Sequence, residues 1–216
     1  MSIEAIIFDL DGTIVDTEPA AALVLEKCFL EWNIIPDAKD QHQIAGVKWE
    51  LALKYFYSKY PIPEKFELVF PKVLNRYHDA IKTKLIEIPG SRDAIKRLSK
   101  DFRLALVSGS HQKEIQMVLK KLQLTSYFEL ILGSEDYEKS KPDPEGFLKA
   151  MNKLNFTPQR TLIFEDSYPG ICAAKAANAK VCAVKHANHF DHDQSMADYS
   201  IADFLNVNSS WVRTLV

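Results

Sequence analysis

The sequence has little cysteine, and its few cysteines are not arranged as a disulfide framework. Cys28, Cys172 and Cys182 are odd in number, widely spaced and set among apolar neighbours. A small disulfide-rich domain would have an even number of cysteines at closer spacings. We therefore expect reduced, structural thiols rather than metal ligands or nucleophiles. Such thiols suit a reducing compartment, and a cytoplasmic location is the expectation.

A long hydrophobic run and an excess of one charge are also missing. Asp9 and Asp11 interrupt the only apolar candidate near the amino end, and no basic segment precedes it. We therefore expect neither a signal peptide nor a membrane span. With 27 basic and 29 acidic residues the formal net charge is −2, which gives no general attraction to nucleic acid or to an anionic membrane.

A long helical stretch follows the first apolar segment. Residues 5–8, Ala-Ile-Ile-Phe, are typical of a buried strand, whereas helical periodicity dominates from Thr17 to Lys84 with no convincing strand between. Ile88-Pro89-Gly90 ends this stretch. The pattern predicts an all-helical insertion over residues 15–88 in a domain that consists of residues 1–14 and 89–216.

Helices and short apolar strands alternate after Gly90. The periodicity predicts helices near residues 91–99, 112–122, 144–154 and 167–177, and strands at 103–107, 130–132, 161–164 and 180–184. This alternation favours an α/β fold with a Rossmann-like, doubly wound parallel sheet and helices on both faces. A short strand at 199–201 and a terminal helix around 203–207 complete the prediction.

Polar side chains follow four of the expected strands. They are Asp9, Ser108, Lys141 after a longer loop, and the pair Glu165 and Asp166. In an open parallel sheet, ligands bind at the carboxyl ends of the strands. We therefore expect these groups to lie together at one edge of the sheet.

Asp9 and Asp11 pose a separate problem of charge. Residues two apart in an extended chain point to the same side, so the two carboxylates converge. Such a pair requires a cation, a shared proton or free water.

Four motifs together resemble the haloacid dehalogenase-like superfamily, in its phosphatase and phosphomutase branch with a helical cap. The motifs are D-L-D-G-T at residues 9–13, V-S-G-S containing Ser108, K-P-D-P beginning at Lys141, and E-D-S at 165–167 followed by Gly170. Their order and spacing match across nearly the whole chain. The resemblance implies that residues 15–88 form a cap domain.

A magnesium site is expected among the acidic residues. Mg²⁺ prefers hard oxygen ligands and keeps several waters, which suits Asp9 and Asp166. Glu165 is either a further ligand or a partner that holds the ligands. The resemblance implies that Asp11 completes the site through its backbone carbonyl.

Two carboxylates have distinct expected roles in phosphoryl transfer. Asp9 is the candidate nucleophile that forms an aspartyl-phosphate, and Asp11 is the candidate general acid and base. Ser108, the amide of Gly109 and the Lys141 ammonium are expected to hold the phosphate oxygens.

The segment 45–50 resembles a substrate-facing cap loop. Lys48 could meet a second anionic group and Trp49 could stack on a flat face of the substrate. A solvated lysine and a core tryptophan are the alternatives, and they are slightly favoured.

The chain departs from β-phosphoglucomutases at three positions. Alignment from the first motif places Ala21 where these mutases have a hinge histidine, Trp49 where they have a substrate-gripping arginine, and His111 where they have a lysine. These departures favour hydrolysis of a small phosphorylated metabolite, with sugar phosphates as candidates. A phosphomutase is the alternative, and a non-catalytic phospho-acceptor or binding protein is a third possibility. Dehalogenation is disfavoured because Asp11 is present.

Overall fold

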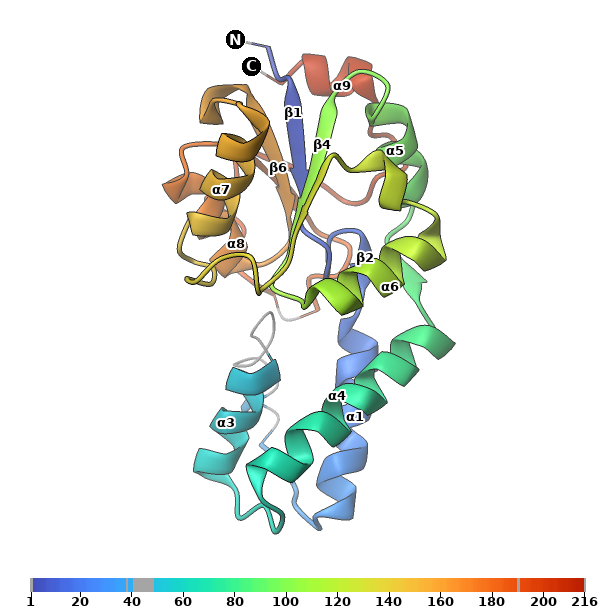
Figure 1. Cartoon of the computed structure of the whole chain (residues 1–216), viewed down its shortest axis with the longest axis vertical. Coiled ribbons are helices and arrows are strands. Elements are labelled where there is room, and N and C mark those ends of the chain that lie inside the picture. The colour runs from blue at the N-terminus through green and yellow to red at the C-terminus, as the bar shows by residue number, and fades with distance from the viewer. Residues whose placement is uncertain (1, 38, 41–48, 190, 216) are drawn as a thin grey trace. The chain divides into compact units, whose positions relative to one another are not determined.

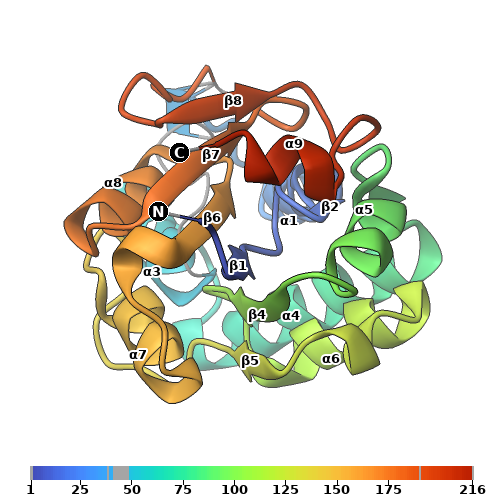
Figure 2. The same cartoon turned by 90° about the horizontal axis from the view of Figure 1, so that it is seen from above.

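The centre of the fold is a six-stranded parallel sheet. The computed structural model describes residues 2–37, 39–40, 49–189 and 191–215. The strand order is β5-β4-β1-β6-β7-β8, and each neighbouring pair is parallel (Figures 1 and 2). The strands are β1 (Ala5–Phe8), β4 (Arg103–Val107), β5 (Leu130–Leu132), β6 (Thr161–Glu165), β7 (Lys180–Val184) and β8 (Tyr199–Ile201). The predicted doubly wound α/β fold is confirmed.

The apolar run of each central strand explains its position. All four residues of β1 are buried, and β1 lies between β4 and β6. Successive residues point to opposite faces, so Ile7 and Ile163 belong to one face while Phe8 and Phe164 stack on the other, with ring centroids 5.1 Å apart. Both faces of the sheet are therefore covered by hydrophobic layers.

Helices cover the two faces of this sheet. Figure 2 shows α7 (Glu145–Leu154) and α8 (Tyr168–Ala176) on one face, and α5 (Ser91–Leu98), α6 (Gln112–Leu122) and α9 (Ser209–Arg213) on the other. Short 3₁₀ helices occupy Thr125–Tyr127 and Pro158–Arg160. The chain moves outward from β1 through β4 to β5, then returns to β6. In open parallel sheets ligands bind at such a reversal, which here lies at the carboxyl ends of β1 and β6.

The terminal helix begins later than predicted. Residues 203–207 form bends and turns, and α9 begins at Ser209. Asn208 precedes this helix, and its side-chain oxygen accepts a hydrogen bond from the backbone amide of Trp211 at 3.0 Å. This N-cap fixes the start of the helix.

Two short strands flank the helical insertion. β2 (Val15–Asp16) and β3 (Ile86–Glu87) form an antiparallel ribbon. The chain accordingly divides into two compact units: Met1–Asp16 with Ile86–Val216, and Thr17–Leu85. The sequence predicted neither strand, because two residues are too few to show a periodicity.

The second unit, Thr17–Leu85, contains helices with a core of their own. The helices are α1 (Glu18–Glu31), α3 (Trp49–Lys59) and α4 (Phe66–Thr83), and both α1 and α3 pack against α4. Phe29 packs edge-on against Phe56, with ring centroids 4.9 Å apart. None of the helices in the described part of the chain combines the length and apolar content that crossing a membrane requires.

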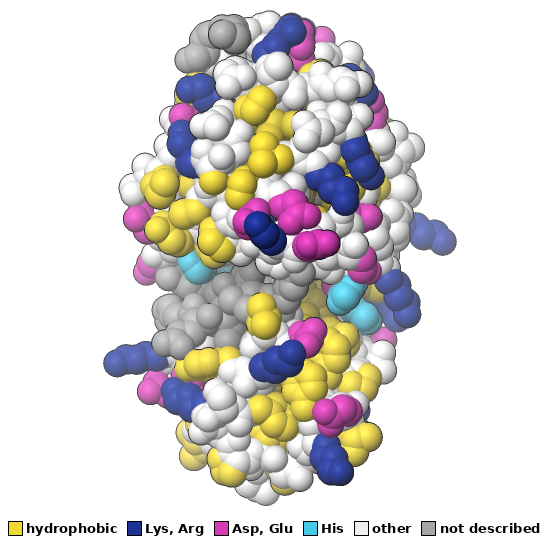
Figure 3. Space-filling model, turned by 60° about the vertical axis from the view of Figure 1, so that its left-hand side comes forward, with side chains coloured by type: hydrophobic (Ala, Val, Ile, Leu, Met, Phe, Trp, Pro, Cys, Tyr) yellow, Lys and Arg dark blue, Asp and Glu magenta, His cyan; other side chains and the backbone are white. Residues whose placement is uncertain are grey.

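Several large hydrophobic side chains of the second unit are exposed. Figure 3 shows hydrophobic side chains grouped on one face of this unit. The exposed ones include Leu23, Leu30, Ile35, Leu51 and Leu68. Nothing on this face indicates what would cover it, so we assign no partner to it.

Candidate active site

Asp9 lies where β1 ends, beside the end of β6. Its backbone amide donates to the carbonyl of Phe164 at 3.0 Å, which extends the pairing of the two strands by one residue. The Lys141 ammonium donates to Asp9 Oδ1 and to Glu165 Oε1, both at 2.5 Å. Residues from three segments that are far apart in the sequence therefore converge, as their positions after the strands predicted.

Glu165 is fully buried and is occupied by local donors. Its Oε2 accepts hydrogen bonds from the backbone amides of Asp166 and Ser167, at 2.9 and 2.8 Å, and from the Ser167 hydroxyl at 2.9 Å. A Cβ atom on Gly170 would overlap the Glu165 carboxylate, so glycine is required where α8 begins. With Lys141 on the other oxygen, this carboxylate organises the backbone around the site.

Asp166 contacts the loop that follows β1. The Thr13 hydroxyl donates to Asp166 Oδ1 at 3.1 Å. Gly12 has a φ of +78°, and a Cβ atom there would overlap the Asp166 carboxylate. Only glycine allows both this backbone conformation and so close an approach. The two acidic motifs are therefore in direct contact.

Burial controls the electrostatics of these groups. It raises the pKa of Asp9 well above its usual value, and the Lys141 ammonium opposes this only in part. Burial and the nearby carboxylates of Glu165 and Asp9 also raise the pKa of Asp166. Burial would lower the pKa of Lys141, but the Asp9 and Glu165 carboxylates raise it, so this side chain stays charged. The Lys141 ammonium bonds to two of these three carboxylates, Asp9 and Glu165, and a further cation would stabilise the group.

The donor set fits a magnesium ion. In the described part of the chain, Asp9 Oδ2 and Asp166 Oδ2 accept no hydrogen bond, which leaves one oxygen of each carboxylate for a metal. No group of three or more His, Cys, Asp or Glu side chains is arranged around a common metal position among the described residues. Mg²⁺ commonly uses one or two carboxylates and completes its octahedron with water or carbonyl oxygens.

The Asp11 carboxylate has different partners from that of Asp9. Its Oδ2 accepts hydrogen bonds from the hydroxyls of Ser110 at 2.8 Å and Ser108 at 3.3 Å. Ser108 is buried at the end of β4, and its carbonyl accepts a hydrogen bond from the Tyr137 hydroxyl at 2.8 Å. The sequence reasoning missed Ser110, although its place two residues after Ser108 is a usable signal.

The remaining candidate residues are placed as follows. Gly109 is exposed, and a Cβ atom there would meet nothing within 4 Å, so the space beside this residue is open. Trp49 begins α3 and is partly buried, and its ring centroid lies 4.9 Å from that of Tyr77 in α4. Lys48 lies outside the described residues.

Known proteins match this chain over most of its length. Residues 6–184 match the family model for haloacid dehalogenase-like hydrolases. A phosphorylated carbohydrates phosphatase from Thermotoga maritima is 32% identical over 187 residues, which cover 85% of this chain and 86% of that protein. A phosphoglycolate phosphatase from Aquifex aeolicus is 33% identical over 184 residues and covers 81% of each chain.

A solved structure gives the same result for the fold. A β-phosphoglucomutase from Clostridium difficile is similar with a TM-score of 0.81 at 25% identity, over 98% of this chain and 96% of that chain. The resemblance expected from the four motifs is confirmed by these matches. The chain therefore belongs to the haloacid dehalogenase-like hydrolase family, as an enzyme of its phosphatase and phosphomutase type.

Proposed function

We propose that this chain is a Mg²⁺-dependent phosphatase that hydrolyses a small phosphorylated metabolite through an aspartyl-phosphate on Asp9. The observation that carries the proposal is the Lys141 ammonium, which joins Asp9 to Glu165 at the carboxyl ends of β1 and β6. A carboxylate can attack an anionic phosphate ester only where positive charge is concentrated.

Asp9, Asp166 and the backbone carbonyl of Asp11 would hold the magnesium ion. When bound, Mg²⁺ would neutralise charge on the phosphate oxygens and so favour attack by a carboxylate. We assign Glu165 to positioning rather than to the metal, because Lys141 and three local donors already occupy its oxygens.

Asp9 and Asp11 divide the chemistry in two steps. In the first step an Asp9 oxygen bonds to phosphorus while the ester oxygen leaves and takes a proton from Asp11. In the second step Asp11 takes a proton from water, the water oxygen bonds to phosphorus, and the bond to Asp9 breaks to release phosphate. The serine hydroxyls on Asp11 support this role because they hold the carboxyl group at the end of β4.

Three groups would bind the phosphate oxygens. Lys141 supplies the positive charge, while the Ser108 hydroxyl and the Gly109 amide supply neutral donors at the end of β4. The open space at Gly109 leaves room for the phosphate group.

The helical unit is proposed as the cap that selects the substrate. Two observations support this assignment. Residues Thr17–Leu85 form a compact unit, and the similarity to the Thermotoga maritima phosphatase covers 85% of the chain, which is more than the first unit alone. Similarity to the phosphorylated carbohydrates phosphatase of Thermotoga maritima supports a sugar phosphate as the substrate of this chain. A cytoplasmic location is part of the proposal and is supported by three free cysteines.

The nucleophile provides the direct test. Asp9→Asn should abolish measurable phosphate release, because an amide cannot form the aspartyl-phosphate. The measurement is phosphate release across a panel of sugar phosphates, phosphoglycolate and nucleotides, after circular dichroism has established matched folding. Asp93→Asn, a change of an exposed aspartate in α5, is the control that should keep full activity. Undiminished turnover by pure Asp9→Asn would reject the proposal.

A phosphomutase is the second candidate, because the β-phosphoglucomutase of Clostridium difficile has the same fold. The same panel, extended to bisphosphorylated hexoses and scored for isomerisation, separates the two. Isomerisation faster than phosphate release would favour the mutase.

A further inference from the structure

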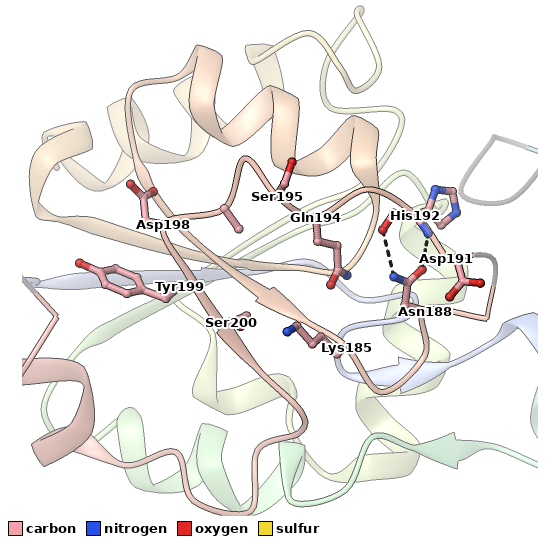
Figure 4. A pocket seen from close by; sticks show the side chains of 10 residues that line it. Lys185, Asn188, Asp191, His192, Gln194, Ser195, Asp198, Tyr199 and Ser200 are labelled. Atoms are coloured by element: carbon pink, nitrogen blue, oxygen red, sulfur yellow. Dashed lines mark hydrogen bonds between the residues drawn. The ribbon is translucent and has the colours of Figure 1, made fainter.

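Gln194 connects two strand ends beside the site. It lies between β7 and β8, among the residues that line a surface pocket (Figure 4). Its side-chain Nε2 donates to the carbonyl of Asp166 at 2.6 Å and to the carbonyl of Val184 at 3.0 Å. An amide nitrogen carries two hydrogens, so it can donate to both carbonyls at once.

The two carbonyls lie where the pairing of β6 and β7 stops. The last paired residues are Glu165 and Ala183, and Asp166 and Val184 are the next residues along each strand. Gln194 therefore bridges the first residues beyond the paired part of β6 and β7. One of these residues is Asp166, which belongs to the second acidic motif.

The loop around Gln194 is itself ordered by side chains. Asn188 Nδ2 donates to the carbonyl of His192 at 3.1 Å, and the amide of His192 donates to Asn188 Oδ1 at 2.8 Å (Figure 4). Asp193 Oδ1 accepts a hydrogen bond from the amide of Ser195 at 2.9 Å. These bonds on both sides of Gln194 hold its backbone in place.

Asp166 is thus fixed by a different residue at each of its polar groups. Its amide donates to Glu165 at 2.9 Å, its carboxylate accepts from Thr13 at 3.1 Å, and its carbonyl accepts from Gln194. Both the amide and the carbonyl must be held to fix the direction in which the carboxylate leaves the chain.

We infer that Gln194 is a positioning residue for Asp166, which sets the geometry of the magnesium site. The inference rests on the proposed function, since it assumes that Asp166 binds the ion. Residues that orient metal ligands typically contribute about 10–100-fold to metal affinity or activity. Among the described residues, the side chain of Gln194 hydrogen-bonds to the backbone carbonyls of Asp166 and Val184, so its effect on catalysis passes through Asp166.

Two substitutions test this role. Gln194→Met keeps the length of the side chain but removes the donor, and Gln194→Glu places a carboxylate against two carbonyls. Calorimetry of Mg²⁺ binding without substrate should show affinity weakened about 10–100-fold in each, with kcat reduced and KM for substrate little changed. The thermal midpoint without metal identifies a variant that fails to fold, and the other variant then decides. Gln116→Met, a change of an exposed glutamine in α6, is the matched control and should bind Mg²⁺ as the wild type does.

The outcomes separate this inference from the proposed function. Wild-type Mg²⁺ affinity in the folded Gln194 variants, with Asp166→Asn weakened, would overturn the positioning role alone. A wild-type protein that binds no Mg²⁺ would overturn the proposed function and the positioning role together. Loss of thermal stability without a change in Mg²⁺ affinity would show that Gln194 only supports the fold.

Discussion

Asp9 and Asp11 are two residues apart, yet their neighbours are chemically opposite. Asp9 contacts an ammonium, whereas Asp11 contacts the hydroxyls of Ser108 and Ser110. The ammonium favours the ionised form of Asp9 and opposes the effect of burial on its pKa, whereas neutral hydroxyls can accompany a carboxyl group in either protonation state. This difference separates a nucleophile from a group that exchanges protons.

The division of labour predicts an asymmetric result for Asp11→Asn. This variant should bind Mg²⁺ nearly as the wild type does, because only the backbone carbonyl of Asp11 is proposed as a ligand. Its kcat should fall by about 10²–10⁴-fold, the usual contribution of proton transfer. Calorimetry and phosphate release measure the two quantities. A large loss of Mg²⁺ affinity would contradict the assignment.

Some residues of the site could not be found from sequence. Lys141 and Asp166 follow predictable strands within recognisable motifs. Gln194 belongs to no recognisable motif, and its partner Asp166 lies 28 positions away in the chain. Contacts of this kind depend on how loops return to the sheet, which local patterns do not encode.

At the scale of elements, a buried carboxylate organises the second unit. Asp40 is 1% exposed and accepts hydrogen bonds from the Tyr55 hydroxyl at 2.7 Å and from Lys59 and Tyr60. Burial acts to raise its pKa, but the hydrogen bonds from these three side chains outweigh it and lower the pKa to about 2. The ionised form is therefore favoured by folding.

The sign of this shift gives a pH dependence. Because the pKa of Asp40 is lower in the folded state, its contribution to stability is present above about pH 4 and is lost as the pH falls toward about 2. Asp40→Asn should lower the free energy of unfolding by about 1–3 kcal/mol at pH 7, because buried donors lose a charged acceptor. Urea unfolding at several pH values should show this difference shrinking between about pH 4 and pH 2.

A matched control separates the buried carboxylate from charge in general. Asp79→Asn removes a carboxylate of α4 whose side chain is 75% exposed and pairs with Lys82. An exposed pair contributes about 0–1 kcal/mol, so this variant should stay near wild-type stability. Equal losses in the two variants would contradict the role given to Asp40.

At the scale of the whole molecule, the helical unit should govern choice of substrate rather than chemistry. Lys48→Ala should lower kcat/KM for a phosphorylated carbohydrate by about 10–100-fold, the range expected for a charged hydrogen bond, and Trp49→Ala should lower it through lost stacking, while activity on p-nitrophenyl phosphate changes less. Lys65→Ala, a change of an exposed lysine in the same unit, is the control. Equal effects on both substrates would argue against recognition by this segment.

Prediction from the sequence was most accurate where a local pattern of residues determines the arrangement of the whole fold. The alternation of strands and helices after Gly90 determined the parallel sheet, and residues after strand ends predicted one edge of it. The ribbon of β2 and β3 was missed because its pairing joins Asp16 to Ile86, which lies 70 positions further along the chain. Pairing between residues so far apart depends on the whole fold and produces no periodic pattern of hydrophobic residues in the sequence.

That ribbon has a consequence for how the molecule can change. Val15 pairs with Glu87 and Asp16 with Ile86. The chain therefore leaves for the helical segment and returns from it through two adjacent, paired strands. A foreign segment whose ends are equally close could be grafted between these strands without altering the order of the sheet. The helical segment can in this sense be replaced as a unit. Substrate specificity can then change while the catalytic residues at the strand ends stay the same.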